Sequence, residues 1–558
     1  VTQFTMTTLE ELGLLKMDFL GLRTLTVIQN ATKLAERYSN KKIDLLHIDY
    51  NDPKVLGMIG ASKTVGVFQL ESAGMKNFMK ELKPQSLEDI IAGISLYRPG
   101  PMDFIPQYIK GKNNPESVTY DTPLLKPILE PTYGCIVYQE QVMQIVQALA
   151  GYSLGRADLV RRAMSKKKAS VMEKERQNFV YGNEAEGVPG CIKNGIDEKT
   201  ANKIYDEMID FAKYAFNKRS SLHAAAYAFV SYQTAWLKYY YPVEFMAALM
   251  TSCIDNPGKV AEYILSSRQM GISILPPDIN RSEGKFTVDG KAIRYGMAAV
   301  KGIGKPVMEA IVEERSANGP FRSLKDFAER LSGKEVNKRT VENFIKAGAF
   351  DCFGVTRKQL MFVYTNVLDD VAREKKDSLS GQMSLFDFAD EATKQSYETV
   401  YPDVGEYEKS DLLALEKEVL GIYVSGHPLE EQEECWRKNI SAVTTDFQPD
   451  EETGFPSVTD GAKEIVGGII TDKKIKYTKN NKTMAFLTLE DLVGSMEIVV
   501  FPRDYEKNAA MMQTDARVFI QGRVSAEDDK PSKLICEKIF PLAGIPKELW
   551  IQFPDKET

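Results

Sequence analysis

A single carboxylate stands in the otherwise apolar segment LLKMDFLGLR, residues 14–23. At the two-residue period of a strand, Asp18 and Lys16 project from one face, about 7 Å apart along the backbone, and the apolar residues project from the other. An acid and a base beside a glycine suit metal and phosphate chemistry. A two-metal site, however, needs several oxygen ligands around ions about 4 Å apart, so the partners of Asp18 must come from elsewhere. Alternatively, Asp18 caps a helix expected at 23–38.

Positive charge is concentrated in RADLVRRAMSKKK, residues 156–168. If this run is helical, Arg162 and Lys166 share one face, four residues apart, with Arg161 and Lys168 beside them. Such closely spaced cations repel one another unless water or a polyanion compensates their charge. A solvated helix face is the ordinary interpretation, and a phosphate-binding helix is the alternative.

A second basic segment, rich in aromatic residues, follows at 211–242 and strengthens the phosphate-binding alternative. Its cations can meet phosphates while its rings stack on bases. The rings can equally fill a helical core, and the three- and four-residue spacing of Phe229, Tyr232 and Trp236 favours the core for these three. Its basic residues include Lys213, Lys218, Arg219 and His223.

The segment YGMAAVKGIGKPVMEAIVEER, residues 295–315, has the pattern helix, Gly-x-Gly turn, helix. In a helix-hairpin-helix the glycines, here Gly302 and Gly304, let backbone N–H groups approach a DNA phosphate, and the next helix adds the positive end of its dipole. Lys301 and Lys305 flank this turn.

A Gly-x-Gly pattern alone is often only a tight turn, but a second, degenerate unit is expected in VNKRTVENFIKAGAFD, residues 336–351. Lys338 and Arg339 stand near its start. Two units in tandem, each with basic residues, favour binding to the DNA backbone with little sequence specificity.

The segment GQMSLFDF, residues 381–388, places apolar side chains in a polar and acidic stretch where no local core can accept them. Leu385, Phe386 and Phe388, exposed on a linker, indicate a docking peptide. Chance also places a hydrophobic turn in a linker now and then, so that alternative stays open.

Residues 464–542 alternate between apolar and polar positions, and a helix is expected at 502–511. Three strands, a helix and two further strands fit a small OB-type barrel. A lysine-rich hairpin, DKKIKYTKNNK at 472–482, lies between two of the strands. OB barrels bind single strands through loops and one face, but many bind only proteins, and both alternatives stay open.

Composition limits the class of protein. The chain has 558 residues, 43% of them hydrophobic, enough for several cores and about three to five domains. No apolar stretch reaches the roughly 18 residues of a membrane span and the N-terminus lacks a targeting pattern, so we expect a cytoplasmic protein. Six scattered cysteines and three histidines argue for a reducing compartment and against zinc. A net charge of −7 excludes a wholly basic nucleic-acid coat.

Taken in order, these motifs resemble those of the alpha subunits of bacterial DNA polymerase III, the C-family replicative polymerases. The resemblance covers nearly the whole chain, and several long motifs in one order argue against coincidence. The matching motifs are LLKMDFLGLR, GVFQLES, SLYRPGPM, YQEQVMQI, GYSLGRADLVRRAMSKKK, YAFNK, HAAAYAFVSYQTAWLKYYYP, the hairpin, QMSLF, LGIYVSGHPL and the barrel.

The resemblance implies that Asp18 is the third of three palm carboxylates that bind two Mg²⁺ ions. The other two stand in a segment that this sequence does not contain, and the family's PHP domain and most of its palm and thumb are also missing from it. We therefore expect a fragment of a larger bacterial polymerase. The partners implied are primer–template DNA, deoxynucleoside triphosphates, the sliding clamp, and the clamp-loader and proofreading subunits.

The same resemblance implies roles for individual residues. Those around the triphosphate of the incoming nucleotide are Lys16, Arg161, Arg162, Lys218 and His223. Those on the adjoining fingers surface are Tyr214 and Asn217. The tandem hairpin resembles the duplex-binding element. The peptide that docks on the sliding clamp corresponds to Gln382, Met383, Ser384, Leu385 and Phe386.

One departure from the family concerns the segment NKRSSLHAAAYA. Members usually carry a single serine where this sequence has Arg219 to Leu222. Three additional residues are almost one helical turn, so they shift Lys218 relative to His223 and put the assignment of one of the two in doubt.

We expect a multidomain, mainly α fold with fingers and tandem helix-hairpin-helix units, a C-terminal all-β OB-fold barrel, and a short α/β palm remnant at the N-terminus. The expected parts are the palm remnant at 1–30, the fingers at 31–275, the helix-hairpin-helix region at 276–353, the clamp-binding region and linker at 354–460, the OB fold at 461–545 and a tail at 546–558.

For the full protein, the resemblance implies template-directed nucleotidyl transfer to a primer 3′ end by a two-magnesium mechanism. A non-catalytic scaffold that binds DNA and tethers it to the clamp is the alternative from a different class. Because the sequence holds one catalytic carboxylate of three, we expect the 558 residues alone to bind DNA and clamp without polymerising.

Overall fold

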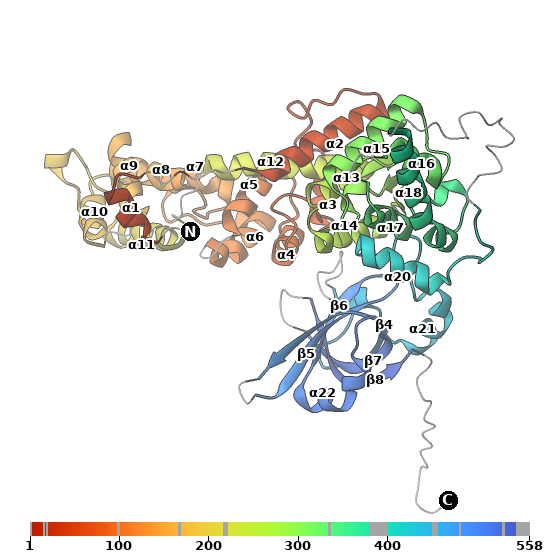
Figure 1. Ribbon diagram of the computed structural model, residues 1–558. Coiled ribbons are helices and arrows are strands. Elements are labelled where there is room, and N and C mark those ends of the chain that lie inside the picture. Colours follow the sequence, from red (N-terminus) through yellow and green to blue (C-terminus); the bar gives the residue numbers. More distant parts are fainter. Residues whose placement is uncertain are drawn as a thin grey trace, which may run out of the picture.

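A row of helical units leads to a small β-barrel beneath one end of the row (Figure 1). The computed structural model describes residues 3–14, 17, 21–97, 101–165, 169–215, 221–332, 336–379, 400–448, 456–478, 481–526 and 531–542. The mainly helical fold with a C-terminal barrel confirms the fold expected from the sequence. Among the described residues, no helix is both long and apolar enough to cross a membrane.

The first long helix is α2 (Arg23–Ser39), which follows the short α1 (Met6–Glu11). None of the described residues of the run 14–23 belongs to a strand, and Arg23 already begins α2. Lys16 and Asp18 lie outside the described residues. One face of α2 packs on the core, because its buried residues recur at three- and four-residue spacing. They are Val27, Ile28, Ala31 and Ala35.

Residues 53–240 form two neighbouring helical units with separate apolar cores. Helix α12 contributes Ala228 and Tyr232 to the first core and Leu237 to the core of the next region, so it ties these regions together. The helices of the first unit are α3 (Pro53–Gly60), α4 (Ala73–Leu82), α5 (Leu87–Leu96), α6 (Ile105–Asn113) and α12 (Ser221–Tyr240). Those of the second are α7 (Lys126–Leu129), α8 (Gln139–Ala150), α9 (Leu154–Ser165), α10 (Ala169–Tyr181) and α11 (Glu198–Ala215).

The aromatic residues of α12 do not all lie in the core. Tyr232 is fully buried and Trp236 is partly buried against apolar neighbours, as expected. Phe229 is 41% exposed and meets Tyr50 edge to face, with 4.8 Å between ring centroids. The prediction of a core position for Phe229 is therefore wrong.

A third and larger core joins α2 with residues 237–371 and with residues 419–424 near the barrel. It includes a three-stranded sheet of order β1-β3-β2, in which β1 runs parallel and β2 antiparallel to β3. The strands are β1 (Ile274–Leu275), β2 (Thr287–Asp289) and β3 (Ala292–Arg294). The helices are α13 (Pro242–Ser252), α14 (Pro257–Gln269), α15 (Lys305–Asn318), α16 (Leu324–Arg330), α17 (Lys338–Lys346), α18 (Arg357–Leu379) and α20 (Lys409–Leu420).

The C-terminal barrel is closed, with strand order β4-β5-β6-β8-β7. Its three strands, helix and two further strands confirm the order expected from the sequence. Gly522 lies at a bulge between β7 and β8, where a Cβ atom would meet the Ile535 carbonyl oxygen at 2.3 Å. Only glycine fits there. The elements are β4 (Lys463–Tyr477), β5 (Thr483–Glu490), β6 (Ser495–Val500), α22 (Pro502–Asn508), β7 (Arg517–Ser525) and β8 (Lys533–Pro541).

Short 3-10 turns link many of these elements. They are η1 (Pro101–Phe104), η2 (Pro115–Ser117), η3 (Pro123–Leu125), η4 (Glu130–Thr132), η5 (Glu184–Glu186), η6 (Met297–Ala299), η7 (Asp351–Phe353), η9 (Glu430–Gln432), η10 (Thr444–Phe447) and η11 (Ala509–Met511). Helix α21 (Glu433–Asn439) packs on the barrel, where the Trp436 indole N–H donates to the Gly467 carbonyl at 2.6 Å.

Helix α20 and the residues after it connect the third core to the barrel (Figure 1). On the helical side, the Lys301 amide donates to the Val419 carbonyl and the Tyr295 hydroxyl to the Leu420 carbonyl. On the barrel side, the Lys417 ammonium lies 3.0 Å from the Asp515 carboxylate. The junction is thus built from contacts on both sides of one helix.

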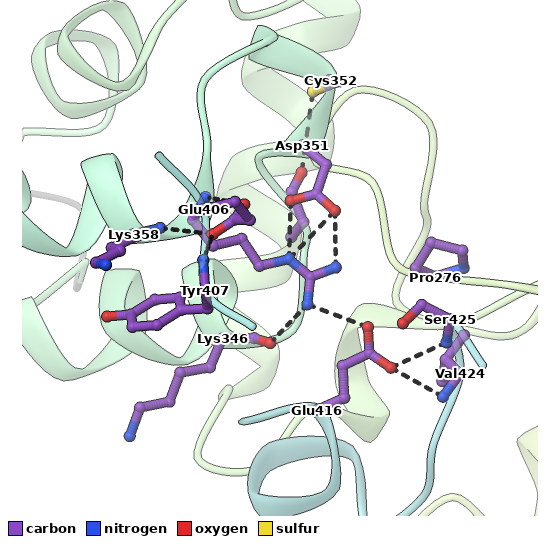
Figure 2. A network of polar contacts seen from close by, with 12 residues as sticks. Pro276, Lys346, Asp351, Cys352, Lys358, Glu406, Tyr407, Glu416, Val424 and Ser425 are labelled. Atoms are coloured by element: carbon purple, nitrogen blue, oxygen red, sulfur yellow. Dashed lines mark hydrogen bonds and ion pairs between the residues drawn. The ribbon is translucent and has the colours of Figure 1, made fainter. Parts of the chain in front are cut away.

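An ion-pair network around one buried carboxylate fixes this junction (Figure 2). The Arg357 guanidinium pairs with the Asp351 carboxylate at 2.7 Å and with the Glu416 carboxylate at 3.1 Å. Glu416 is fully buried, and its second oxygen accepts the backbone N–H groups of Val424 and Ser425. One carboxylate therefore joins α18, α20 and the chain that leads to the barrel.

Candidate nucleotide and nucleic-acid interface

Helix α9 carries two adjacent arginines that share one carboxylate. Arg161 donates from Nε and Nη2 to Asp158 Oδ1, at 2.9 and 2.7 Å. Arg162 Nε lies 2.7 Å from the other oxygen, Asp158 Oδ2. The hydrogen bond from Arg161 holds the pKa of the Asp158 carboxyl below its usual range, so this acid is ionised where it meets the arginines.

A residue from the neighbouring helix completes this arrangement. Gln139, the first residue of α8, accepts a hydrogen bond from Arg161 Nη1 at 3.1 Å. Gln139 is buried, whereas the Arg162 side chain is 64% exposed. Arg161 is thus held on two sides, and the more exposed Arg162 meets the shared carboxylate through its Nε.

Arg156, the first cation of the basic run, is turned inward. Its guanidinium pairs with Glu175 at 2.9 Å and also with Glu186, and it lies over the Tyr152 ring. Glu175 and Glu186 therefore compensate the positive charge of Arg156. From the sequence alone, water or a polyanion was expected to compensate it. Residues 166–168 lie outside the described residues.

The remaining residues predicted around the triphosphate stay predictions. Tyr214 lies in helix α11 and His223 in helix α12. The structure describes the backbone of these two residues but not their side chains. Asn217 and Lys218 lie outside the described residues, as do Lys16 and Asp18. Helix α12 begins at Ser221, which is one of the residues that depart from the family pattern. The expected shift of Lys218 relative to His223 stays a prediction.

The hairpin at 301–305 presents exposed basic side chains around a glycine turn. Gly302 has φ +77°, a conformation that favours glycine. Gly304 is the N-cap of α15 and Lys305 its first residue, as the pattern predicts. Lys301 is exposed, and Lys305 is exposed with Glu309 3.4 Å away.

The first helix predicted for this unit is wrong. Residues 295–300 contain only the three-residue turn η6, because tertiary contacts take up this segment. Tyr295 is buried and its hydroxyl donates to the Leu420 carbonyl at 3.0 Å. The backbone of Lys301 is also held, since its N–H donates to the Val419 carbonyl and its carbonyl accepts from Asn343 Nδ2 at 2.7 Å.

Asn343 links the hairpin to the second unit. It belongs to α17, whose first two residues are the exposed Lys338 and Arg339. Arg339 and Asn343 are four residues apart and share a face of α17, so Arg339 projects on the side of the hairpin. Lys338 pairs with Asp369 of α18 at 2.8 Å.

On the barrel, most of the predicted lysine-rich hairpin is strand. Strand β4 extends to Tyr477 and pairs with β5 from Thr483 onward. Lys476 lies over the Phe486 ring at 4.7 Å, and Tyr477 is exposed. Cations and an aromatic ring thus share this ribbon, a composition typical of nucleic-acid surfaces.

Within the described residues, no group of three or more His, Cys, Asp or Glu side chains could hold a metal ion. The predicted clamp peptide, 382–386, also lies outside the described residues. Sequence reasoning missed Gln139 and Asp158, although the three- and four-residue spacing of Asp158 to the two arginines was a usable signal.

Family models match three parts of this chain. Residues 24–187 match the bacterial DNA polymerase III alpha subunit finger domain. Residues 271–360 match a helix-hairpin-helix motif, and residues 465–542 match an OB-fold nucleic acid binding domain. The three matches follow the order of the helical units, the hairpin region and the barrel.

Curated relatives match nearly the whole chain. DNA polymerase III subunit alpha of Thermus aquaticus is 41% identical over 566 residues, covering 99% of this chain and 44% of that protein. The Bacillus subtilis (strain 168) protein of the same name is 41% identical, covering 95% and 45%. That of Deinococcus radiodurans is 40% identical, covering 100% and 42%. The chain therefore spans less than half the length of these relatives.

Among solved structures, asparaginyl-tRNA synthetase from Pyrococcus horikoshii matches 19% of this chain and 23% of its own, at 17% identity and a TM-score of 0.15. That likeness is too slight to support an inference.

Proposed function

Because this chain is a relative of the DNA polymerase III alpha subunits over nearly its whole length, we propose that it is the fingers, helix-hairpin-helix and OB-fold part of a bacterial replicative DNA polymerase. The observation that carries the proposal is the identity of about 40% across all three matched regions in one order. The whole polymerase extends a primer by template-directed nucleotidyl transfer in the bacterial cytoplasm.

In this proposal the fingers bind the triphosphate of the incoming deoxynucleotide. Arg161 and Arg162 present guanidinium groups, which suit phosphate oxygens in geometry and charge. Further contacts come from Lys16, Lys218 and His223, beside Tyr214 and Asn217. The cations neutralise charge that builds on the leaving pyrophosphate.

Asp18 is proposed as one of three carboxylates that bind two Mg²⁺ ions. Such ions activate the primer 3′-hydroxyl and stabilise the departing pyrophosphate. The described residues contain no group of three or more His, Cys, Asp or Glu side chains that could hold a metal ion. Asp18 itself lies outside those residues, so its assignment to the metal site is supported by the family resemblance alone.

The chain alone should bind primer–template DNA without extending it. Purified residues 1–558, supplied with primed template, Mg²⁺ and all four deoxynucleotides, should give no extension above an Asp18→Ala control. Extension by the unchanged chain that the control lacks would show that Asp18 has its catalytic partners within this sequence, which contradicts the proposal.

Duplex DNA is proposed to lie against the tandem hairpin, with its phosphates near Lys301, Gly302, Gly304 and Lys305, and near Lys338 and Arg339. The exposed lysines and the positive end of α15 support this placement. For the barrel, single-stranded DNA and neighbouring proteins remain the two candidate ligands.

Replacing Lys301 and Lys305 together with alanine should weaken duplex binding equally for all sequences. Each lost phosphate contact reduces the dependence of log K on log salt concentration by about one, so the slope should fall by about two. Fluorescence anisotropy over a salt series measures it. Lys438→Ala is the control, because Lys438 is exposed and pairs with an acid four residues away, as Lys305 does. An unchanged slope in the double variant would rule out phosphate contact at this hairpin.

The peptide formed by Gln382, Met383, Ser384, Leu385 and Phe386 is proposed to dock on the sliding clamp. The clamp-loader and proofreading subunits are proposed as further partners of the whole polymerase, on the ground of the relatives alone. A non-catalytic scaffold would retain DNA and clamp binding, but the complete protein that contains this chain would fail to extend primers.

A further inference from the structure

We infer that Asp158 and Gln139 are positioning residues that hold Arg161 and Arg162 ready for the triphosphate. The inference rests on the proposed function, since it assigns a task to residues that support the proposed nucleotide-binding arginines. Neither residue is proposed to touch the nucleotide.

Arg161 is fixed by several of its own donors. Three of its five N–H donors make directed contacts, two to Asp158 Oδ1 and one to Gln139 Oε1. These acceptors lie on α9 and α8, so the guanidinium plane is held by two helices. A phosphate then meets an oriented guanidinium instead of a freely rotating one, which reduces the ordering cost of binding.

The anchor on α8 is itself held in place by further hydrogen bonds. Gln139 is 8% exposed and is the first residue of its helix. The start of that helix is fixed by Gln141, whose side-chain oxygen accepts the N–H groups of Val137 and Tyr138, and whose amide donates to Thr132 Oγ1 at 2.8 Å. An ordinary surface ion pair within one helix has no such second anchor.

Asp158 also balances the charge of the two arginines. Arg161 and Arg162 are adjacent in sequence and would repel each other without a carboxylate between them. Asp158 contacts one arginine with each oxygen, and the three side chains together keep a net charge of +1. The group thus stays attractive to a polyanion while its two cations remain side by side.

The test uses the complete polymerase that contains this chain, in single-nucleotide incorporation with primed template. We expect Asp158→Ala to raise the KM for deoxynucleotide about tenfold while kcat changes less than threefold. Gln139→Met, which keeps the shape but removes the acceptor, should raise KM about threefold. Gln139→Glu, which restores an acceptor, should bring KM back toward the original value.

A matched control separates this effect from the loss of any helix-surface ion pair. Asp206 pairs with Arg176 at 2.6 Å on the neighbouring helices α10 and α11. Asp206→Ala should leave KM and kcat unchanged. A variant that does not fold is recognised by its thermal unfolding, and Gln139→Met then decides the question, because it alters no charge.

The outcomes distinguish the inference from the proposed function. Absence of primer extension by the unchanged polymerase would overturn the proposed function. Normal extension with an unchanged KM in Asp158→Ala and Gln139→Met would overturn the inference alone. A lower KM in Asp158→Ala would also overturn it, because it would show that Asp158 merely competes with the triphosphate for the arginines.

Discussion

Replacing Glu416 with alanine will lower the free energy of unfolding of the third core by about 3–5 kcal/mol, the usual cost of removing one partner from a buried ion pair. The Glu416 carboxylate is fully buried and accepts hydrogen bonds from Arg357, Val424 and Ser425. Alanine leaves the buried Val424 amide, the Ser425 amide and one side of the guanidinium without this acceptor. The segment at Val424 and Ser425, which leads to the barrel, will then lose its contacts with α20.

Hydrogen exchange measures this loss where it occurs, which suits a chain with several cores. The Val424 and Ser425 amides should exchange at least about a hundredfold faster in Glu416→Ala, since 1.4 kcal/mol corresponds to a factor of ten. Glu418→Ala is the control. Glu418 lies on the same helix, is half exposed, and pairs with Lys346 at 2.8 Å. Its loss should cost less than about 1 kcal/mol. Equal effects in the two variants would show that the buried network does not stabilise the junction.

Replacing Leu385 and Phe386 together with alanine will weaken binding to the sliding clamp about a thousandfold. The magnitude follows if each side chain is a hot spot worth about 2 kcal/mol. The expectation rests on sequence, because two large apolar residues stand in a polar stretch without a core of their own. Apolar anchors also make this contact insensitive to salt, in contrast to DNA binding at the hairpin.

Calorimetric titration of purified clamp into the chain, at two salt concentrations, tests this prediction. Phe362→Ala is the control, because Phe362 is a large apolar side chain of α18 that is 59% exposed. It should bind clamp like the unchanged chain. Unaltered affinity of the double variant would place the clamp-binding site elsewhere.

The barrel and the second half of the hairpin could be predicted from sequence because local signals determine them. Alternating apolar residues define the strands, and the glycine at 302 meets the need for a positive φ. Tyr295 shows where this reasoning fails. Its segment has a helical pattern, but the hydroxyl bonds to the Leu420 carbonyl, 125 residues later, and the segment forms only a turn.

Sequence patterns also could not predict the polar contacts between residues that are far apart in the sequence. Arg357 and Glu416 are 59 residues apart, and no periodicity connects them. Gln139 and Arg161 come from different helices and meet only after those helices pack. Phe229 has core spacing but lies on a part of α12 that its neighbours cover only in part. The residues implied by family resemblance at 16, 18, 217–218 and 382–386 stay predictions.

Closure of the third core by Val419, Leu420 and Val424 has a consequence for synthesis of the chain. When every helix through α18 has left the ribosome, these residues have not yet been synthesised or released. The apolar surface that α20 covers in the folded protein is then still exposed to solvent. Domains that await a late segment expose surface prone to aggregation. The nascent helical region should therefore depend on a chaperone, or on the pace of translation, until residue 424 has emerged.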